Sequence, residues 1–368
     1  MTENSILETD LSALRSNVEQ IRREIGPDRK LIPVLKGDAY GLGAVRIARF
    51  LSGLGGIDTF AVSHVQEGIA LREAGIREQI LVMSLPLRDQ MADALCYRLV
   101  MTLGGFHQFR PLRELAASAG RKIPVNLKLD TGLHRIGFLP EETDALCGAL
   151  LESRDALEIV GTFSHHAAHD PETLDTQDRR FEEALEALRA AGIDPGLRHI
   201  AASASLEADP ARLYDAVRVG RRLFLDHPTR PTGRIREAVS FRTRVTDVRI
   251  RKAGETLGYE GRVRLDRDAR IGVLAVGYGD GLDPALAGAG APVLVNGEEA
   301  RLLAVCMDQS FIRLDGIPCE PGDEATLFGR DREGRLLSAQ RSAGLIGWEG
   351  CDLTSRLTPR VKRVYLEG

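Results

Sequence analysis

The sequence is poor in cysteine and has no long apolar run. Its 368 residues include five cysteines, and none of them forms a C-x-x-C pair. An odd number of scattered cysteines predicts reduced thiols, as in a cytoplasmic protein, rather than a disulfide framework. No apolar run approaches the ~20 residues needed to span a bilayer. The opening MTENSILETDLSALRSN has no basic segment followed by an apolar one, so we expect no secretory signal.

The sequence also lacks a large excess of positive or negative charge. Lys and Arg number 49 and Asp and Glu 53, which gives a net charge of −4. The charges are interspersed, so we expect neither nucleic acid nor a membrane surface as a partner. We also predict no metal site. With 43% hydrophobic residues, the chain is long enough for one large domain and a smaller one.

From residue 31 to about residue 222, short apolar runs alternate with amphipathic stretches. The amphipathic stretches, such as GAVRIARFLSGLG and TQDRRFEEALEALRAAG, have apolar residues at steps of three and four, which is typical of helices. Eight such strand–helix units favour a (β/α)8 TIM barrel over a doubly wound open sheet, which shares the alternation. The expected strands are 31–36, 59–63, 80–84, 99–104, 123–130, 160–165, 198–203 and 216–222.

Unusual polar residues collect where these strands end. In such a barrel the loops at the carboxyl ends of the strands form the active-site face. One polar residue at a strand end is ordinary, but polar residues at five of eight ends predict a site. They include Lys36, Asp38 and Tyr40 after the first strand, Lys128, Asp130, Thr131 and Arg135 after the fifth, Ser164, His165 and His166 at the sixth, His199 and Ser203 around the seventh, and Arg218 and Gly220 in the eighth.

After about residue 235 the helical periodicity ends. Short runs typical of strands follow, such as VSFRTRVTDVRIRK, ARIGVLAVGYG and EATLFG, separated by glycine or proline. We therefore expect a barrel over residues 1–230 and a mostly β domain over residues 231–368, with the boundary near HPTRPTG (227–233).

The motifs, taken in order, resemble those of the pyridoxal-phosphate-dependent alanine racemases. The likeness covers nearly the whole chain. It is carried by VLKGDAYGLG, KLDTGLHRIGF, GTFSHHA, HIAASAS and VRVG in the first part, and by GETLGYEG, VGYGDGL, VCMDQ and RVKRVY in the second. The resemblance implies an isomerase that interconverts L- and D-alanine with pyridoxal 5'-phosphate, built as a barrel followed by a β domain.

The resemblance also implies how the cofactor is held. Lys36 would carry it as a Schiff base, which needs an amine that can be neutral, and burial lowers a lysine's pKa. His165 would pack on or beside the pyridine ring, and Arg218 would face the pyridine nitrogen. An arginine cannot accept the ring proton, so the pyridine should stay a weaker electron sink. The phosphate would be held by Tyr40, Ser203 and the backbone at Gly220.

For the substrate, the resemblance implies a carboxylate clamp at Arg135, oriented by Lys128, which is a candidate for carbamylation in that family's manner. Racemisation needs two bases on opposite faces of the α-carbon. Lys36 would be one of them, and Tyr259 from the other subunit's second domain would be the other. Met307 and Asp308 would line the same mouth. The functional unit would then be a homodimer with shared active sites.

Several positions depart from the family's pattern. Trp348 stands where the family has a tyrosine that reaches the cofactor phosphate, and its indole donates from a different point. The others are Ala202, Arg221, His166, and Asp283 with Pro284. These departures leave substrate choice open, so a racemase for serine or a broader set of amino acids is an alternative to alanine. A decarboxylase of basic amino acids and a non-catalytic pyridoxal-phosphate-binding protein are weaker alternatives.

Overall fold

The computed structural model describes residues 3–168, 170–208, 212–226 and 232–367. The chain divides into two compact units. The first, called the barrel unit here, comprises Glu19–Ala39 and Ala44–Gly220. The second, called the β unit, comprises Met1–Val18, Tyr40–Gly43 and Arg221–Gly368. Most of the expected boundary segment, residues 227–231 of 227–233, lies outside the described residues.

The barrel unit contains the eight parallel strands that the alternation predicts. Strands β3 to β8 form one sheet in sequence order, and β2 pairs with β9. Isolated parallel bridges from Val34 to Ala61 and from Ala202 to Arg218 link these two sheets, so the strands form a barrel, as expected. The strands are β2 (Lys30–Pro33), β3 (Thr59–Val62), β4 (Gln79–Val82), β5 (Val100–Leu103), β6 (Ile123–Lys128), β7 (Leu157–Phe163), β8 (Leu197–His199) and β9 (Ala216–Val219).

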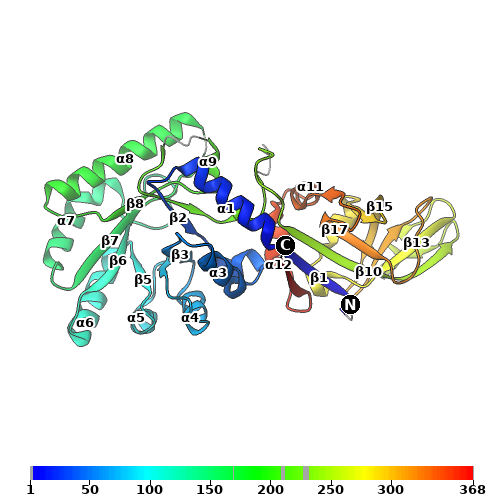
Figure 1. The fold of residues 1–368 in the computed structure, drawn as a ribbon, viewed down its shortest axis with the longest axis horizontal. Helices are drawn as coiled ribbons and strands as arrows, with labels where there is room; N and C mark the ends of the chain where they lie inside the picture. Colours follow the sequence, from blue (N-terminus) through cyan, green and yellow to red (C-terminus); the bar gives the residue numbers. More distant parts are fainter. Residues whose placement is uncertain (1–2, 169, 209–211, 227–231, 368) are drawn as a thin grey trace. The chain divides into compact units, whose positions relative to one another are not determined.

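Helices follow the strands and lie on the outer side of the barrel (Figure 1). They are α3 (Ala44–Gly53), α4 (Val65–Glu73), α5 (Arg88–Cys96), α6 (Phe109–Ala119), α7 (Thr143–Glu152), α8 (Pro171–Ala190) and α9 (Ser203–Ala208). The longest, α8, begins with a proline after Asp170, whose side chain accepts a hydrogen bond from the Thr173 amide. Both features are typical of helix starts.

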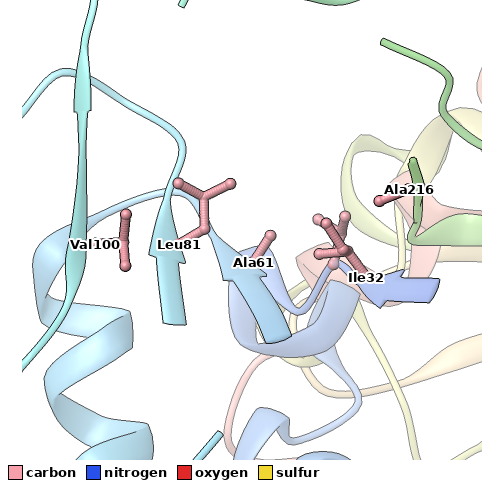
Figure 2. Packing of buried hydrophobic residues seen from close by; sticks show 6 residues of the cluster. Ile32, Ala61, Leu81, Val100 and Ala216 are labelled. Atoms are coloured by element: carbon pink, nitrogen blue, oxygen red, sulfur yellow. The ribbon is translucent and has the colours of Figure 1, made fainter. Parts of the chain in front are cut away.

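Apolar side chains from neighbouring strands fill the inside of the barrel. Ile32, Ala61, Leu81, Val100 and Ala216 belong to one buried cluster, with one residue from each of five strands (Figure 2). Small and large side chains alternate around this cluster, as in a packed barrel interior. The rigid core beneath fixes where each strand ends, and therefore where the polar residues beyond it lie.

The segment around Lys36 differs from the expectation in its local structure. The first strand ends at Pro33 rather than at residue 36, and Lys36 opens the short helix α2 (Lys36–Gly41). From Gly37 to Gly41 every residue has a positive φ, between 54° and 83°, so this turn is left-handed. Asp38, Ala39 and Tyr40 each adopt this conformation at a cost of about 1–2 kcal/mol, and such conformations cluster at functional sites.

The β unit is built on a sheet of nine strands in the order β18-β17-β14-β15-β16-β13-β10-β1-β19. An additional pairing between β17 and β10 closes six of these strands into a ring. The N-terminal strand β1 pairs with β10, Ser5 lying opposite Thr243. The strands are β1 (Ser5–Asp10), β10 (Val239–Arg251), β13 (Ala269–Leu274), β14 (Pro292–Val295), β15 (Glu298–Val305), β16 (Ser310–Arg313), β17 (Glu324–Arg330), β18 (Leu336–Leu337) and β19 (Lys362–Leu366), with β11 (Thr256–Leu257) and β12 (Val263–Arg264) forming a separate pair.

This unit is mostly β, as predicted, but the expectation that helices end after residue 235 is wrong. Three short helices occur, α10 (Pro284–Gly288), α11 (Ala339–Gly344) and α12 (Gly350–Arg356). Each has only five to seven residues, too few for a helical period to stand out in the sequence. Helix α1 (Leu11–Ile25) follows β1. Among the described residues, no helix combines the length and apolarity that a membrane crossing requires.

Candidate active site

Arg218 is the centre of a buried polar cluster at the carboxyl ends of β7, β8 and β9. Its Nη1 lies 2.6 Å from Nδ1 of His199, and its Nη2 lies 3.0 Å from Nδ1 of His165. The same two nitrogens donate to the carbonyl oxygens of His199, Ser164 and Ile200 at 2.8–3.1 Å. Within the described residues, Nε takes no part in these contacts. The guanidinium therefore has a fixed orientation with one donor still available.

The contacts with Arg218 determine the protonation of both histidines. A guanidinium has donors only, so Nδ1 of His165 and Nδ1 of His199 both accept, and each neutral ring carries its proton on Nε2. Burial, followed by the charge of Arg218, lowers the pKa of His165 far below its usual value. The same two causes lower the pKa of His199. The His199 ring also stacks on Phe163, 5.2 Å between centroids. Both imidazoles are thus neutral hydrogen-bonding groups.

Lys128 and Asp130 end β6 and are both buried. The Nζ atom of Lys128 donates to the Leu129 carbonyl at 2.5 Å. Burial lowers the pKa of Lys128 to about 7; the charge of Asp130 opposes this shift, and Arg218 and Arg135 add to it. The amine is therefore largely neutral above pH 7. A neutral lysine amine among cations is the form that can react with carbon dioxide.

The Asp130 carboxylate holds the turn that carries Arg135. It accepts hydrogen bonds from the amides of Gly132, His134 and Arg135 at 3.0–3.1 Å. Burial raises the pKa of Asp130, but these amide contacts and the charge of Lys128 outweigh burial and lower it overall. The carboxylate stays ionised and fixes the backbone of the turn. The Arg135 side chain itself is exposed.

Lys36 lies at the end of the segment that follows β2, and its side chain is exposed. The expected burial of this lysine is therefore not found in the structure. Glu67, at the start of α4, accepts from the Gly37 amide at 2.6 Å and from the Ser63 amide at 2.7 Å. This carboxylate anchors the left-handed turn at the residue directly after Lys36. The backbone is held, while the Lys36 amine is exposed.

Ser203 and Gly220 meet at the ends of β8 and β9. The Gly220 amide donates to the Ser203 hydroxyl oxygen at 3.2 Å. The Ser203 hydroxyl can donate its own hydrogen to a phosphate oxygen, and the Gly220 amide can do so by exchanging its contact with Ser203 for one with the phosphate. The barrel residues Lys128, His165, Ser203, Arg218 and Gly220 thus lie at the carboxyl ends of β6, β7, β8 and β9.

Apart from Lys36 and Arg135, the remaining predicted site residues belong to the β unit. Tyr40 is half-buried and packs edge-on against Phe224, 6.4 Å between ring centroids. Burial, with the nearby Cys351 thiol, raises the pKa of the Tyr40 phenol, while the charge of Arg221 opposes this. The phenol stays protonated and can donate. The turn after it is fixed within the same unit, because Arg363 donates to the Gly41 carbonyl at 2.9 Å.

Tyr259 and Met307 are exposed in the β unit, at 63% and 47% of their surface. Their segments are neighbours, since a Cβ at Gly258 would lie 3.8 Å from Sγ of Cys306. Asp308 forms an ion pair with Arg360 at 2.6 Å, and Arg360 also contacts Asp280 at 3.1 Å. Two large side chains are thus exposed in neighbouring segments of this unit.

The residues that depart from the family's pattern each have a local partner. The Arg356 guanidinium lies over the Trp348 ring, 3.9 Å from its centroid. Asp283 caps α10 through the Ala285 amide. Buried His166 contacts Asp178 at 2.9 Å. Arg221 donates to the Asp226 carbonyl at 2.6 Å. Ala202 continues the strand pairing opposite Arg218. These substitutions are therefore integrated into the packing.

The donor set of the barrel unit fits pyridoxal phosphate. A phosphate needs donors, which Ser203 and the Gly220 amide supply. An aromatic ring next to His165 meets a neutral imidazole, and Arg218 has Nε available for a ring nitrogen. Lys36 supplies an exposed amine for the aldehyde carbon. No group in this set is chemically incompatible with that cofactor.

Three residues at this end of the barrel were not assigned a role from the sequence: Glu67, His199 and Gln177. His199 was noted among the polar residues at strand ends, and Gln177 also has a readable signal. It lies at helical spacing between Leu174 and Phe181 on the apolar stripe of α8, where a polar residue is unexpected. Glu67 had no such signal, because a glutamate in the first turn of a helix is ordinary.

The fold and the site define a class, namely a (β/α)8-barrel enzyme with a buried polar cluster at the carboxyl ends of its strands and a β domain. Comparison with known proteins makes this more specific. The family models "Alanine racemase, N-terminal domain" and "Alanine racemase, C-terminal domain" match residues 9–228 and 238–365. Together they cover most of the chain, which therefore belongs to the alanine racemase family.

Individual relatives agree with this family. The alanine racemase of Desulforamulus reducens is 31% identical over 100% of both chains, and that of Pectobacterium atrosepticum is 34% identical over 97% of both. Among solved structures, the alanine racemase of the D-cycloserine producer Streptomyces lavendulae has a TM-score of 0.93 at 29% identity, covering 100% of this chain and 98% of that one. The alanine racemase of Streptomyces coelicolor has a TM-score of 0.92 at 30% identity, covering 99% and 98%.

Proposed function

We propose that this chain is a pyridoxal-phosphate-dependent isomerase that interconverts L- and D-alanine. The observation that supports this most is the Arg218 cluster, in a chain that belongs to the alanine racemase family. This cluster consists of a cation and two neutral imidazoles at the carboxyl ends of the barrel strands, where Lys128, Ser203 and Gly220 also lie.

When bound, pyridoxal phosphate supplies an electron sink next to the α-carbon of the amino acid. Arg218 would face the pyridine nitrogen, and because a guanidinium has no acceptor it would leave that nitrogen unprotonated. The sink is then weaker, which suits a reaction that only moves a proton. Lys36 would hold the cofactor through its amine, and this amine would serve as the base that moves the proton on one face of the α-carbon.

Arg135 binds the substrate carboxylate, since a guanidinium can bind a carboxylate with two parallel hydrogen bonds. Lys128 is carbamylated and orients Arg135. The neutral amine supports this, because the carbamate would place a negative charge near the cations of Arg218 and Arg135. His165 packs beside the pyridine ring as a neutral imidazole.

Tyr40, Ser203 and the Gly220 amide hold the phosphate. Their donors support this, because all three are protonated and none carries a negative charge. Trp348 contributes to the phosphate site or the substrate channel from the C-terminal segment, where its ring is held by Arg356.

The second base is Tyr259 from another copy of the chain. Met307 and Asp308 of that copy line the entrance of the same active site. The exposure of Tyr259 and Met307 supports an interface at this surface. The functional unit is then a homodimer with shared active sites. We place the protein in the cytoplasm, which is consistent with five free cysteines.

A direct exchange experiment tests the proposal. The purified chain, loaded with pyridoxal phosphate, is incubated in D2O with L-alanine, D-alanine or L-serine. We expect α-deuteration and loss of optical rotation with both alanine enantiomers, at a higher rate than with serine. Loss of carbon dioxide from a basic amino acid without racemisation of alanine would contradict the proposed function.

A further inference from the structure

Gln177 is a buried amide on α8 that contacts two of the loops that form the site. Only 1% of its surface is exposed. It belongs to the apolar stripe of a 20-residue helix whose other inward residues include Leu174, Phe181 and Leu185. A buried amide stabilises a fold only when its donors and acceptor are satisfied. Its partners therefore show what the residue does.

The first loop that Gln177 contacts is the one after β6. The Nε2 of Gln177 donates to Oγ1 of Thr131 at 3.2 Å. Thr131 Oγ1 is also 2.9 Å from Oγ of Ser164. Arg180, one helical turn further along α8, donates to the Thr131 carbonyl at 3.1 Å. Two side chains of one helix thus hold Thr131, which directly follows Asp130 and begins the turn that leads to Arg135.

The second loop is the one after β7. The Nε2 of Gln177 also donates to the His165 carbonyl at 3.2 Å, and its Oε1 accepts from the Ala167 amide at 2.8 Å. The amide spans the residues on either side of His166. The backbone of His165 is therefore fixed from α8, while its imidazole is fixed from β9 by Arg218.

We infer that Gln177 is a positioning residue that sets the Arg135 turn and the His165 loop relative to each other, and that Arg180 supports the Arg135 turn alone. The inference rests on the proposed function, because it assumes that Arg135 binds the substrate carboxylate and that His165 lies beside the cofactor. An amide is suited to this role, since it offers two donors and an acceptor in one plane. A carboxylate at this position would keep the acceptor for Ala167 but lose the donor to the His165 carbonyl.

Substitutions of Arg180 and of Gln177 should have different effects. Arg180→Ala removes one hydrogen bond to Thr131 and no contact with the His165 loop. It should raise the KM for L-alanine by about 2- to 10-fold, the range for one hydrogen bond, and leave the visible circular dichroism of bound pyridoxal phosphate unchanged. Gln177→Glu, which is isosteric, should raise KM by a similar factor and also change that circular dichroism band, because the environment of the cofactor ring is altered.

A matched control is available on the same helix. Arg179 is exposed and pairs with Glu183 at 3.1 Å, so Arg179→Ala should change neither KM nor the band. Thermal unfolding of each variant separates a loss of stability from a loss of positioning. The inference is overturned if Arg180→Ala matches Arg179→Ala in KM, or if Gln177→Glu keeps the wild-type KM and band, whatever its melting temperature.

The outcomes also separate this inference from the proposed function. If the wild-type chain fails to racemise alanine, the proposed function fails. The circular dichroism of Gln177→Glu loaded with pyridoxal phosphate still decides the inference, because that band does not depend on turnover. If the wild type racemises alanine and the variants behave as wild type, the inference alone fails. Should Gln177→Glu not fold, the KM of Arg180→Ala against Arg179→Ala decides it.

Discussion

Nη1 of Arg218 lies 2.6 Å from Nδ1 of His199. Because arginine only donates, this contact fixes the tautomer of the histidine and keeps it from taking up a second proton. The same guanidinium holds His165 in the same way at 3.0 Å. The charge state of the centre of the site is therefore a consequence of packing among β7, β8 and β9, and it gives the first prediction.

We predict that His165 and His199 stay neutral, with the proton on Nε2, from pH 8 down to pH 5. Burial and Arg218 lower the pKa of both rings. Ring ¹⁵N chemical shifts of histidine-labelled protein report tautomer and charge. Assignment of the two signals uses the variants His165→Asn and His199→Asn. A cationic shift for either ring near pH 6 would contradict the prediction.

The same lowered pKa values affect stability. An unfolded histidine takes up a proton near pH 6.5, whereas these two rings in the folded chain do not. The unfolded state therefore binds more protons as the pH falls, and the free energy of unfolding decreases below about pH 6.5. Urea unfolding at pH 7.5 and pH 5.5 should show this decrease, and it should be smaller in His199→Asn.

Lys128 should form a carbamate. Its pKa of about 7 means that the amine is available as a nucleophile above neutral pH. In ¹³C-labelled bicarbonate at pH 8, the wild-type protein should give a carbamate carbon signal that Lys128→Arg lacks. Lys122, which is exposed on the same unit, provides the control Lys122→Arg. A carbamate signal that persists in Lys128→Arg would assign the modification to another residue.

Lys36 should be the residue that carries the cofactor, and the protein should be yellow when isolated. Its exposed amine beside the anchored left-handed turn is the reason. After reduction with borohydride, peptide mapping should find the pyridoxyl group on Lys36. Lys128 is the informative alternative because burial lowers the pKa of its amine to about 7. A label on Lys128 would refute the assignment of Lys36.

Arg135→Lys should weaken substrate use and leave cofactor absorbance intact. Lysine offers a point charge in place of two parallel hydrogen bonds. The loss of one charged hydrogen bond, about 1.5–3 kcal/mol, corresponds to a kcat/KM for alanine that is lower by about 10- to 150-fold. Arg154→Lys, at an exposed position of the same unit, is the control. Kinetics equal to this control would remove Arg135 from the site.

The sequence predicted the barrel well because each strand was a short apolar run with a helical period after it. The polar residues at strand ends followed from the same alternation. The sequence did not predict that the segment after β2 is left-handed or that Lys36 is exposed, because the turn is held by Glu67, thirty residues away. It also gave no sign that β1 pairs with β10, since Ser5 and Thr243 meet only through the tertiary fold.

Tyr259 provides the test that separates racemisation from other reactions on this scaffold. Tyr259→Phe removes a hydroxyl from an exposed side chain, so folding and cofactor binding should survive. Loss of a general base typically costs about 10²- to 10⁴-fold. Racemisation should fall by about that factor in both directions, since the equilibrium between enantiomers cannot change. Tyr97→Phe, which removes a hydroxyl bonded to Glu73, is the control and should keep full activity.

The two bases should also act on different enantiomers, each exchanging the α-proton of one of them. If Lys36 handles the proton of the D-enantiomer and Tyr259 that of the L-enantiomer, the Tyr259→Phe protein should still exchange solvent deuterium into D-alanine faster than into L-alanine. If Tyr259 acts across a dimer, mixing Tyr259→Phe with Lys36→Ala subunits should restore activity at the one site per heterodimer that has both groups. Racemisation by Tyr259→Phe at the wild-type rate would refute the two-base proposal. An inactive variant that gains nothing on mixing, although subunit exchange is demonstrated, would show that the tyrosine acts within its own chain.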